Sequence, residues 1–104
     1  MAAISILESQ GLVEAQGQIP YRVPAMHLGS ATEQEITSLS DTPQQSSAFA
    51  ANTSVVMICA DVAIRFRVGT DPTAAATSTR IPADVVYVFG VPRGGTYKIS
   101  VRTA

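Results

Sequence analysis

Apolar and polar residues alternate in short runs through the second half of the chain, from Ser54 to Val101. The clearest run, AIRFRV at 63–68, alternates strictly. Its apolar residues therefore share one face of an extended strand, and Arg65 and Arg67 share the other. A period of two residues over several such runs predicts a small, all-β structure.

Three further runs are predicted to form strands. The continuous apolar run 54–60 suits a strand covered on both faces, and its short link to the next strand, 61–62, fits a hairpin or a sharp bend. The run 84–91 is apolar on both sides, which predicts a central strand or an interface. The run 96–102 closes the series after a predicted hairpin turn at 92–95, where two glycines can adopt positive φ.

The first half of the chain has weaker patterns. Residues 1–30 contain two prolines that remove backbone donors, which predicts an extended N-terminal arm rather than central strands. We expect a strand at 35–39, although capping-box spacing leaves a brief helix at 31–36 as an alternative. Phe49 is a predicted core anchor. The expected fold is an antiparallel, jelly-roll-like β-sandwich over residues 31–104.

Composition adds a reason to expect an assembly component. The 104 residues are enough for one domain with one modest core. Charged residues make up 14% of the chain, whereas about 25% is usual. Surfaces rich in Ala, Ser and Thr are often buried against other subunits, and the alternative is an alanine-rich surface in contact with solvent.

The distribution of charge is more informative than its sum. The formal net charge of −1 argues against nucleic-acid or membrane partners, because both need a concentrated basic footprint. Acidic residues dominate before Ser54 and basic residues dominate after it. One interpretation is that the first half of one copy lies on the body of its neighbour; the other is that both halves face solvent.

The sequence contains no evident catalytic or metal-binding group. The single cysteine, Cys59, lies in an apolar run, and the single histidine, His27, lies in a segment flanked by proline, so a catalytic Cys–His pair is not expected. Asp61, Asp71 and Asp84 follow or precede strands and would suit Ca²⁺, but aspartate at strand ends is also an ordinary turn former. We predict no enzymatic activity and no cofactor.

Targeting signals are also absent from the pattern. The chain begins without a basic region followed by an apolar stretch of signal-peptide length. No run approaches the ~18 consecutive apolar residues of a membrane-spanning helix. We therefore expect neither secretion by that route nor insertion in a membrane.

A basic face is predicted if the strands that carry the basic residues are neighbours. Arg65, Arg67, Lys98 and Arg102 would then lie together. Single-strand binders present stacking rings beside such groups, and here Tyr97 alternates away from Lys98. Salt bridges to the acidic segment, or plain solvation, are preferred to a nucleic-acid site.

The order of turns and strands from Val55 to Val101 resembles small virion proteins encoded by tailed bacteriophages. The shared sequence pattern is a strand, Gly-x-(Asn/Asp)-Pro-x-Ala, a Ser/Thr-rich loop, Leu/Ile-Pro, a strand, a glycine turn and a closing strand. In this chain it is carried by 63–69 (AIRFRVG), 71–74 (DPTA), 81–83 (IPA), 88–91 (VFGV) and 97–101 (YKISV). The matching positions are structural, so no functional residue is carried over.

The resemblance implies a non-enzymatic structural protein, of the type that decorates or cements a phage head. We expect it on the virion surface, made in the host cytoplasm, bound to the major capsid protein at subunit junctions, and forming a homo-oligomer with a trimer favoured. Alternatives are a tail, connector or fibre-attachment component and a carbohydrate- or host-binding β-module. The candidate subunit or capsid contacts are Tyr21, Arg22, Val23, Met26, Leu28, Arg65 and Arg67.

Overall fold

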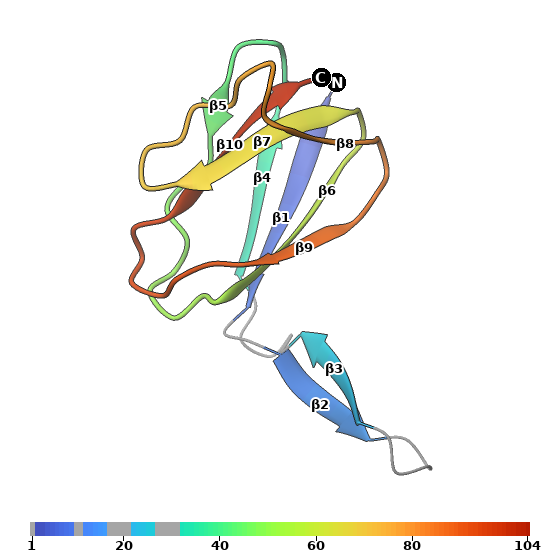
Figure 1. Ribbon diagram of the computed structural model, residues 1–104, viewed down its shortest axis with the longest axis vertical. Coiled ribbons are helices and arrows are strands. Elements are labelled where there is room, and N and C mark those ends of the chain that lie inside the picture. The colour runs from blue at the N-terminus through green and yellow to red at the C-terminus, as the bar shows by residue number, and fades with distance from the viewer. Residues whose placement is uncertain (1, 10–11, 17–21, 27–31) are drawn as a thin grey trace.

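The computed structural model describes residues 2–9, 12–16, 22–26 and 32–104, with side chains for 2–9 and 32–104. Every regular element in these residues is a β-strand (Figure 1). None of them forms a helix long and apolar enough to cross a membrane. The strands are β1 (Ala3–Ser9), β2 (Leu12–Gln16), β3 (Arg22–Met26), β4 (Thr32–Thr37), β5 (Gln44–Gln45), β6 (Val55–Ala60), β7 (Ile64–Gly69), β8 (Thr79–Ile81), β9 (Tyr87–Gly90) and β10 (Lys98–Thr103).

Two four-stranded antiparallel sheets form the body of the protein. The first has the order β4-β1-β6-β9 and the second has the order β5-β10-β7-β8. Figure 1 shows the two sheets enclosing a common interior, and the core cluster draws residues from both. The predicted all-β, antiparallel architecture is confirmed and suits a small β-sandwich.

The core is built by the alternation that the sequence shows. On each strand every second residue points inward, so apolar residues at those positions are removed from water. Complete burial of one such side chain stabilises the fold by roughly 1.5–3 kcal/mol. The most buried members are Ile4 and Ile6 on β1, Val56 and Ile58 on β6, Ile64 on β7, and Ile99 and Val101 on β10. Phe49, the predicted anchor, is 3% exposed.

The predicted N-terminal arm, residues 1–30, is wrong at its beginning. β1 lies between β4 and β6, in the centre of the first sheet. Its apolar residues Ile4 and Ile6 pair in register with Ala60 and Ile58. The short apolar run forms a strand because its neighbours β4 and β6 supply backbone hydrogen bonds that an isolated arm would lack.

The remainder of that segment contains a separate two-stranded sheet. β2 and β3 pair antiparallel, with Leu12 opposite Met26 and Gln16 opposite Arg22. Pro24 lies within β3, which has β2 as its one neighbour among the described strands, and such an edge position tolerates proline. Figure 1 shows this hairpin beyond one end of the two larger sheets.

The turn at 92–95 joins the two sheets, so the predicted hairpin is wrong. β9 pairs with β6 in the first sheet, whereas β10 pairs with β5 and β7 in the second. The glycines adopt positive φ as expected, 134° at Gly94 and 73° at Gly95. The Gly94 N–H donates to the Ala51 carbonyl at 2.9 Å, which holds the crossing against the neighbouring loop.

Two other strand predictions need adjustment. The segment 32–37 is a strand, so the helical alternative is wrong and the predicted strand begins three residues earlier than expected. β9 covers only part of the predicted strand 84–91 and lies at the edge of the first sheet, so it is not central. The link 61–63 is a bend between sheets, one of the two expected forms.

A buried carboxylate links β1, β4 and the loop before β6. Glu8 is 1% exposed, and its Oε1 accepts hydrogen bonds from Ala50 N at 2.7 Å and Thr53 Oγ1 at 3.0 Å. Its Oε2 accepts from Gln34 Nε2 at 2.7 Å. A buried carboxylate needs such donors because it has lost its hydration shell.

Substitution of Glu8→Gln is expected to lower the free energy of unfolding by about 1–3 kcal/mol. The amide keeps the size of the side chain but presents N–H groups to donors. Urea denaturation measures the effect, and Asp41→Asn, at an exposed position in the bend after β4, is the matched control, expected within about 0.5 kcal/mol of the parent. Equal midpoints for both variants would contradict the role given to Glu8.

Substitution of Gly95→Ala is expected to destabilise the fold by about 1–2 kcal/mol, because φ is +73° and an added Cβ would lie 3.4 Å from Ala51 Cα. Gly69→Ala is the control. Its new Cβ would meet nothing closer than Pro72 Cβ at 3.9 Å. Thermal unfolding of the pair should show a loss for Gly95→Ala alone; an equal loss for both would refute the strain at Gly95.

Candidate interaction surfaces

The outer face of the second sheet carries a row of arginines. β7 lies between β10 and β8, and the register places Arg65 opposite both Arg102 and Arg80. Directly opposed residues in an antiparallel pair share one face of the sheet. Arg67 lies two residues along β7, on the same face, and is exposed. These four residues are the arginine face.

The contacts of these arginines are to carbonyl oxygens rather than to carboxylates. Arg65 Nη1 donates to Ser78 O at 2.9 Å, and Arg102 Nε donates to Thr103 O at 3.4 Å. Within the described part of the chain, no ion pair joins the arginine face. The expected neighbour relation of Arg65, Arg67, Lys98 and Arg102 is confirmed by the β7–β10 pairing, in which Lys98 lies opposite Gly69.

Sequence reasoning missed Arg80 and misjudged the surface around β10. Arg80 belongs to β8, a three-residue strand hidden in a segment interpreted as loop and turn. Ser100, placed outward by alternation, is fully buried because the loop after β7 covers it, with Ala74 N donating to Ser100 Oγ at 2.9 Å. The signal for β8 was the apolar Ile81, which is buried opposite Ile64.

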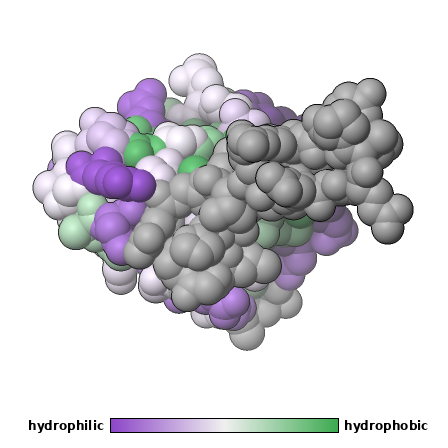
Figure 2. Space-filling model, turned by 90° about the horizontal axis from the view of Figure 1, so that it is seen from below, coloured by the Kyte–Doolittle hydropathy of each residue, from purple (hydrophilic) through white to green (hydrophobic). Residues whose placement is uncertain are grey.

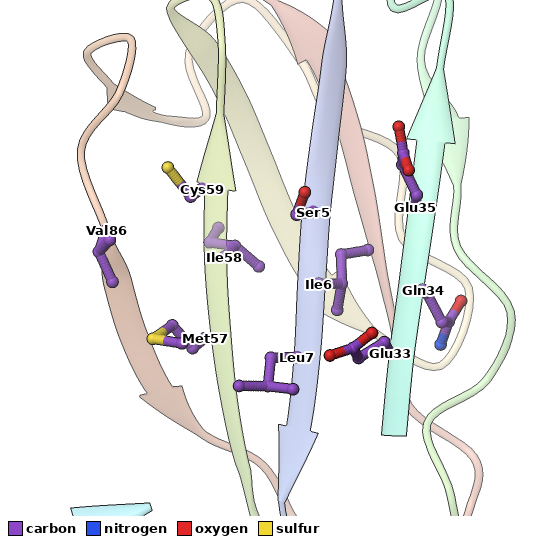
Figure 3. A pocket seen from close by; sticks show the side chains of 10 residues that line it. All are labelled: Ser5, Ile6, Leu7, Glu33, Gln34, Glu35, Met57, Ile58, Cys59 and Val86. Atoms are coloured by element: carbon purple, nitrogen blue, oxygen red, sulfur yellow. The ribbon is translucent and has the colours of Figure 1, made fainter. Parts of the chain in front are cut away.

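The outer face of the first sheet has the opposite character. A shallow apolar trough of about 410 Å³ lies there, shown in Figure 3. The register defines one row across the sheet, with Leu7 between Glu33 and Met57, and Val88 beyond Met57. The second row places Ser5 between Glu35 and Cys59. Figure 3 shows the two glutamates along β4 and Val86 on the opposite side.

The edge strand β9 continues this apolar surface. Val86 is 56% exposed and Val88 is 48% exposed, and Val85 and Tyr87 are also exposed. The other side of the strand is anchored to the second sheet, since the rings of Phe89 and Phe66 stack with centroids 6.0 Å apart. An apolar edge strand that carries no charge is open to pairing with another chain.

Figure 2 views the molecule from below Figure 1, and its coloured residues show small green apolar areas among purple and white ones. Apolar side chains on this face are thus mixed with polar ones.

The predicted contact residues fall on two separate sheets. Arg65 and Arg67 lie on β7, whereas Arg22, Val23 and Met26 lie on β3 of the hairpin. The structure does not bring the two groups into one sheet. Tyr21 and Leu28 lie outside the described residues, as does His27.

The remaining chemical candidates have structural roles. Asp61 Oδ1 accepts from Ala3 N at 2.8 Å, and Asp71 Oδ1 accepts from Gln45 Nε2 at 2.9 Å. In the segments with described side chains, no three His, Cys, Asp or Glu residues gather where they could hold a metal ion. Cys59 is half-buried in the trough rather than enclosed in the core.

Comparisons with protein-family models, with curated proteins and with solved structures gave no match to this chain.

Substitution of Arg80→Gln is expected to raise the free energy of unfolding by about 0.2–1 kcal/mol at low ionic strength, because it removes one of two like charges opposite each other. The gain should shrink as added salt screens the repulsion. Urea denaturation at two salt concentrations tests this. A gain that does not depend on salt would contradict an electrostatic origin.

Proposed function

We propose that this protein is a non-enzymatic structural component of a phage particle that binds the outer capsid surface where major capsid subunits meet. The observation that carries the proposal is the exposed apolar surface of β9 with the adjoining trough. A small domain gains little from leaving Val85, Val86 and Val88 in water, whereas a partner that covers them gains their transfer free energy.

Two further features support a role in assembly. The β2–β3 hairpin extends beyond the two larger sheets and offers additional surface for a neighbouring subunit. The arginine face suits an acidic partner surface, since guanidinium groups pair with carboxylates in bidentate geometry. The jelly-roll class and the trimeric state belong to this proposal as its finer points.

The mechanism is mass action on the assembled shell. A protein that binds only the assembled lattice stabilises it in proportion to the logarithm of its free concentration over its dissociation constant. An interface of standard size buries roughly 800 Å² on each partner, which is within reach of one face of a domain of this size. No bond is made or broken, so the described surfaces need shape and charge complementarity only.

Immunogold labelling of purified particles from the virus that encodes the chain tests the location. Gold distributed over the whole shell is expected. Gold at a single vertex would replace the capsid assignment with the tail or connector alternative. Absence of the protein from particles, checked by mass spectrometry of the same preparation, would refute a virion role.

A further inference from the structure

The two outer faces of this protein complement each other in charge. The trough on the first sheet is bordered by Glu33 and Glu35, both exposed on β4. The second sheet presents Arg65 and Arg67 on β7, with Arg80 and Arg102 beside them. One chain therefore carries an acidic, apolar face and a basic face on opposite sides of its core.

The spacing of the charges on the two faces also agrees. Glu33 and Glu35 are two residues apart on one strand, as are Arg65 and Arg67, so each pair is separated by about 6.5–7 Å along its strand. Arg67 and Arg80 are exposed, so their guanidinium groups can reach the carboxylates of a neighbouring copy beside the loop that covers Ser100. The aliphatic stems of the arginines can then cover the apolar residues Leu7 and Met57 in the trough.

We infer that copies of this chain associate head to tail, with the trough of one copy on the arginine face of the next. The occupant is a second copy because the same chain supplies both complementary surfaces. The contact is heterologous, so repeated use closes into a ring or continues as a filament. A closed ring of three would match the expected trimer. The contact concerns copies of this chain and stands whether or not the assembly belongs to a capsid.

The charge arrangement determines which faces of two copies meet. Arg65, Arg80 and Arg102 oppose one another across three strands, and like charges in register are unfavourable in the isolated chain. Carboxylates from a neighbouring copy relieve this repulsion. Two arginine faces repel each other, as do two acidic borders, so the face-to-face alternatives are disfavoured.

The test uses two charge-reversal variants of the full chain. Glu33→Arg with Glu35→Arg makes the trough border basic, and Arg67→Glu with Arg80→Glu reverses the two exposed charges of the arginine face and so removes its net positive charge. All four positions are exposed, and Arg65 is left in place because it bonds Ser78 O. Light scattering should find the parent chain associated and each variant alone dissociated. An equal mixture should associate again in even-numbered assemblies of alternating copies, because the arginines introduced at 33 and 35 meet the glutamates introduced at 67 and 80.

A mixture that stays dissociated, or variants that associate as well as the parent chain, would overturn the head-to-tail contact. The second outcome would mean that copies associate through another surface, such as the β9 edge or the β2–β3 hairpin. Added salt is a further control, since it should weaken association of the parent and of the mixture alike.

Cys59 provides a readout that needs no charge variant. It is the only cysteine in the chain and lines the trough. In the parent protein its alkylation by iodoacetamide should slow as protein concentration rises, by about tenfold when nine-tenths of the chains are associated. A rate independent of concentration, across a dilution series in which light scattering reports oligomers at one end and monomers at the other, would refute burial of the trough between copies.

Discussion

The single core shared by the two sheets is the constraint on which the rest of this structure depends. Each strand has one inward side, and only inward residues such as Ile6, Ile58 and Ile99 reach that core. The chain carries more apolar strand surface than this interior can accept. Val88 on β9 and Val86 just before that strand are therefore left outside, although their sequence is as apolar as that of a buried strand. These side chains are exposed because they lie at the edge of the first sheet, away from the side that meets the core.

Glu8 closes the end of the core from which the chain leaves towards the hairpin. Its carboxylate accepts hydrogen bonds from Ala50, Thr53 and Gln34 in place of the water it has lost. These donors come from two other parts of the chain. Gln34 in turn accepts from Ser47 N at 3.1 Å. A polar cluster of this kind ties a loop to the sheet with defined geometry, where apolar contacts alone would allow several arrangements.

The two outer faces acquire different chemistry because each sheet takes its charged strands from a different half of the chain. The first sheet takes β1 and β4 from the acidic half, and the second takes β7, β8 and β10 from the basic half. Antiparallel pairing then gathers like charges on the outside of each sheet. The uneven distribution of charge along the chain thus becomes a separation of charge across the domain, which favours oriented association over random contact.

The sequence by itself determined the local elements of the second half. Alternation predicted the strands β7 and β10 and the outward direction of Arg65 and Arg67, and a continuous apolar run predicted β6. It succeeded because residues two apart on one strand face the same way whatever lies beside them.

Only the tertiary structure decided which strands are neighbours. Pairing placed β1 in the centre of a sheet, β9 at an edge, and Arg80 beside Arg65. It also made 92–95 a link between sheets rather than a hairpin. These results depend on ladders between segments far apart in the chain, such as Ile6 opposite Ile58, and a pattern read along one strand contains no information about its partner.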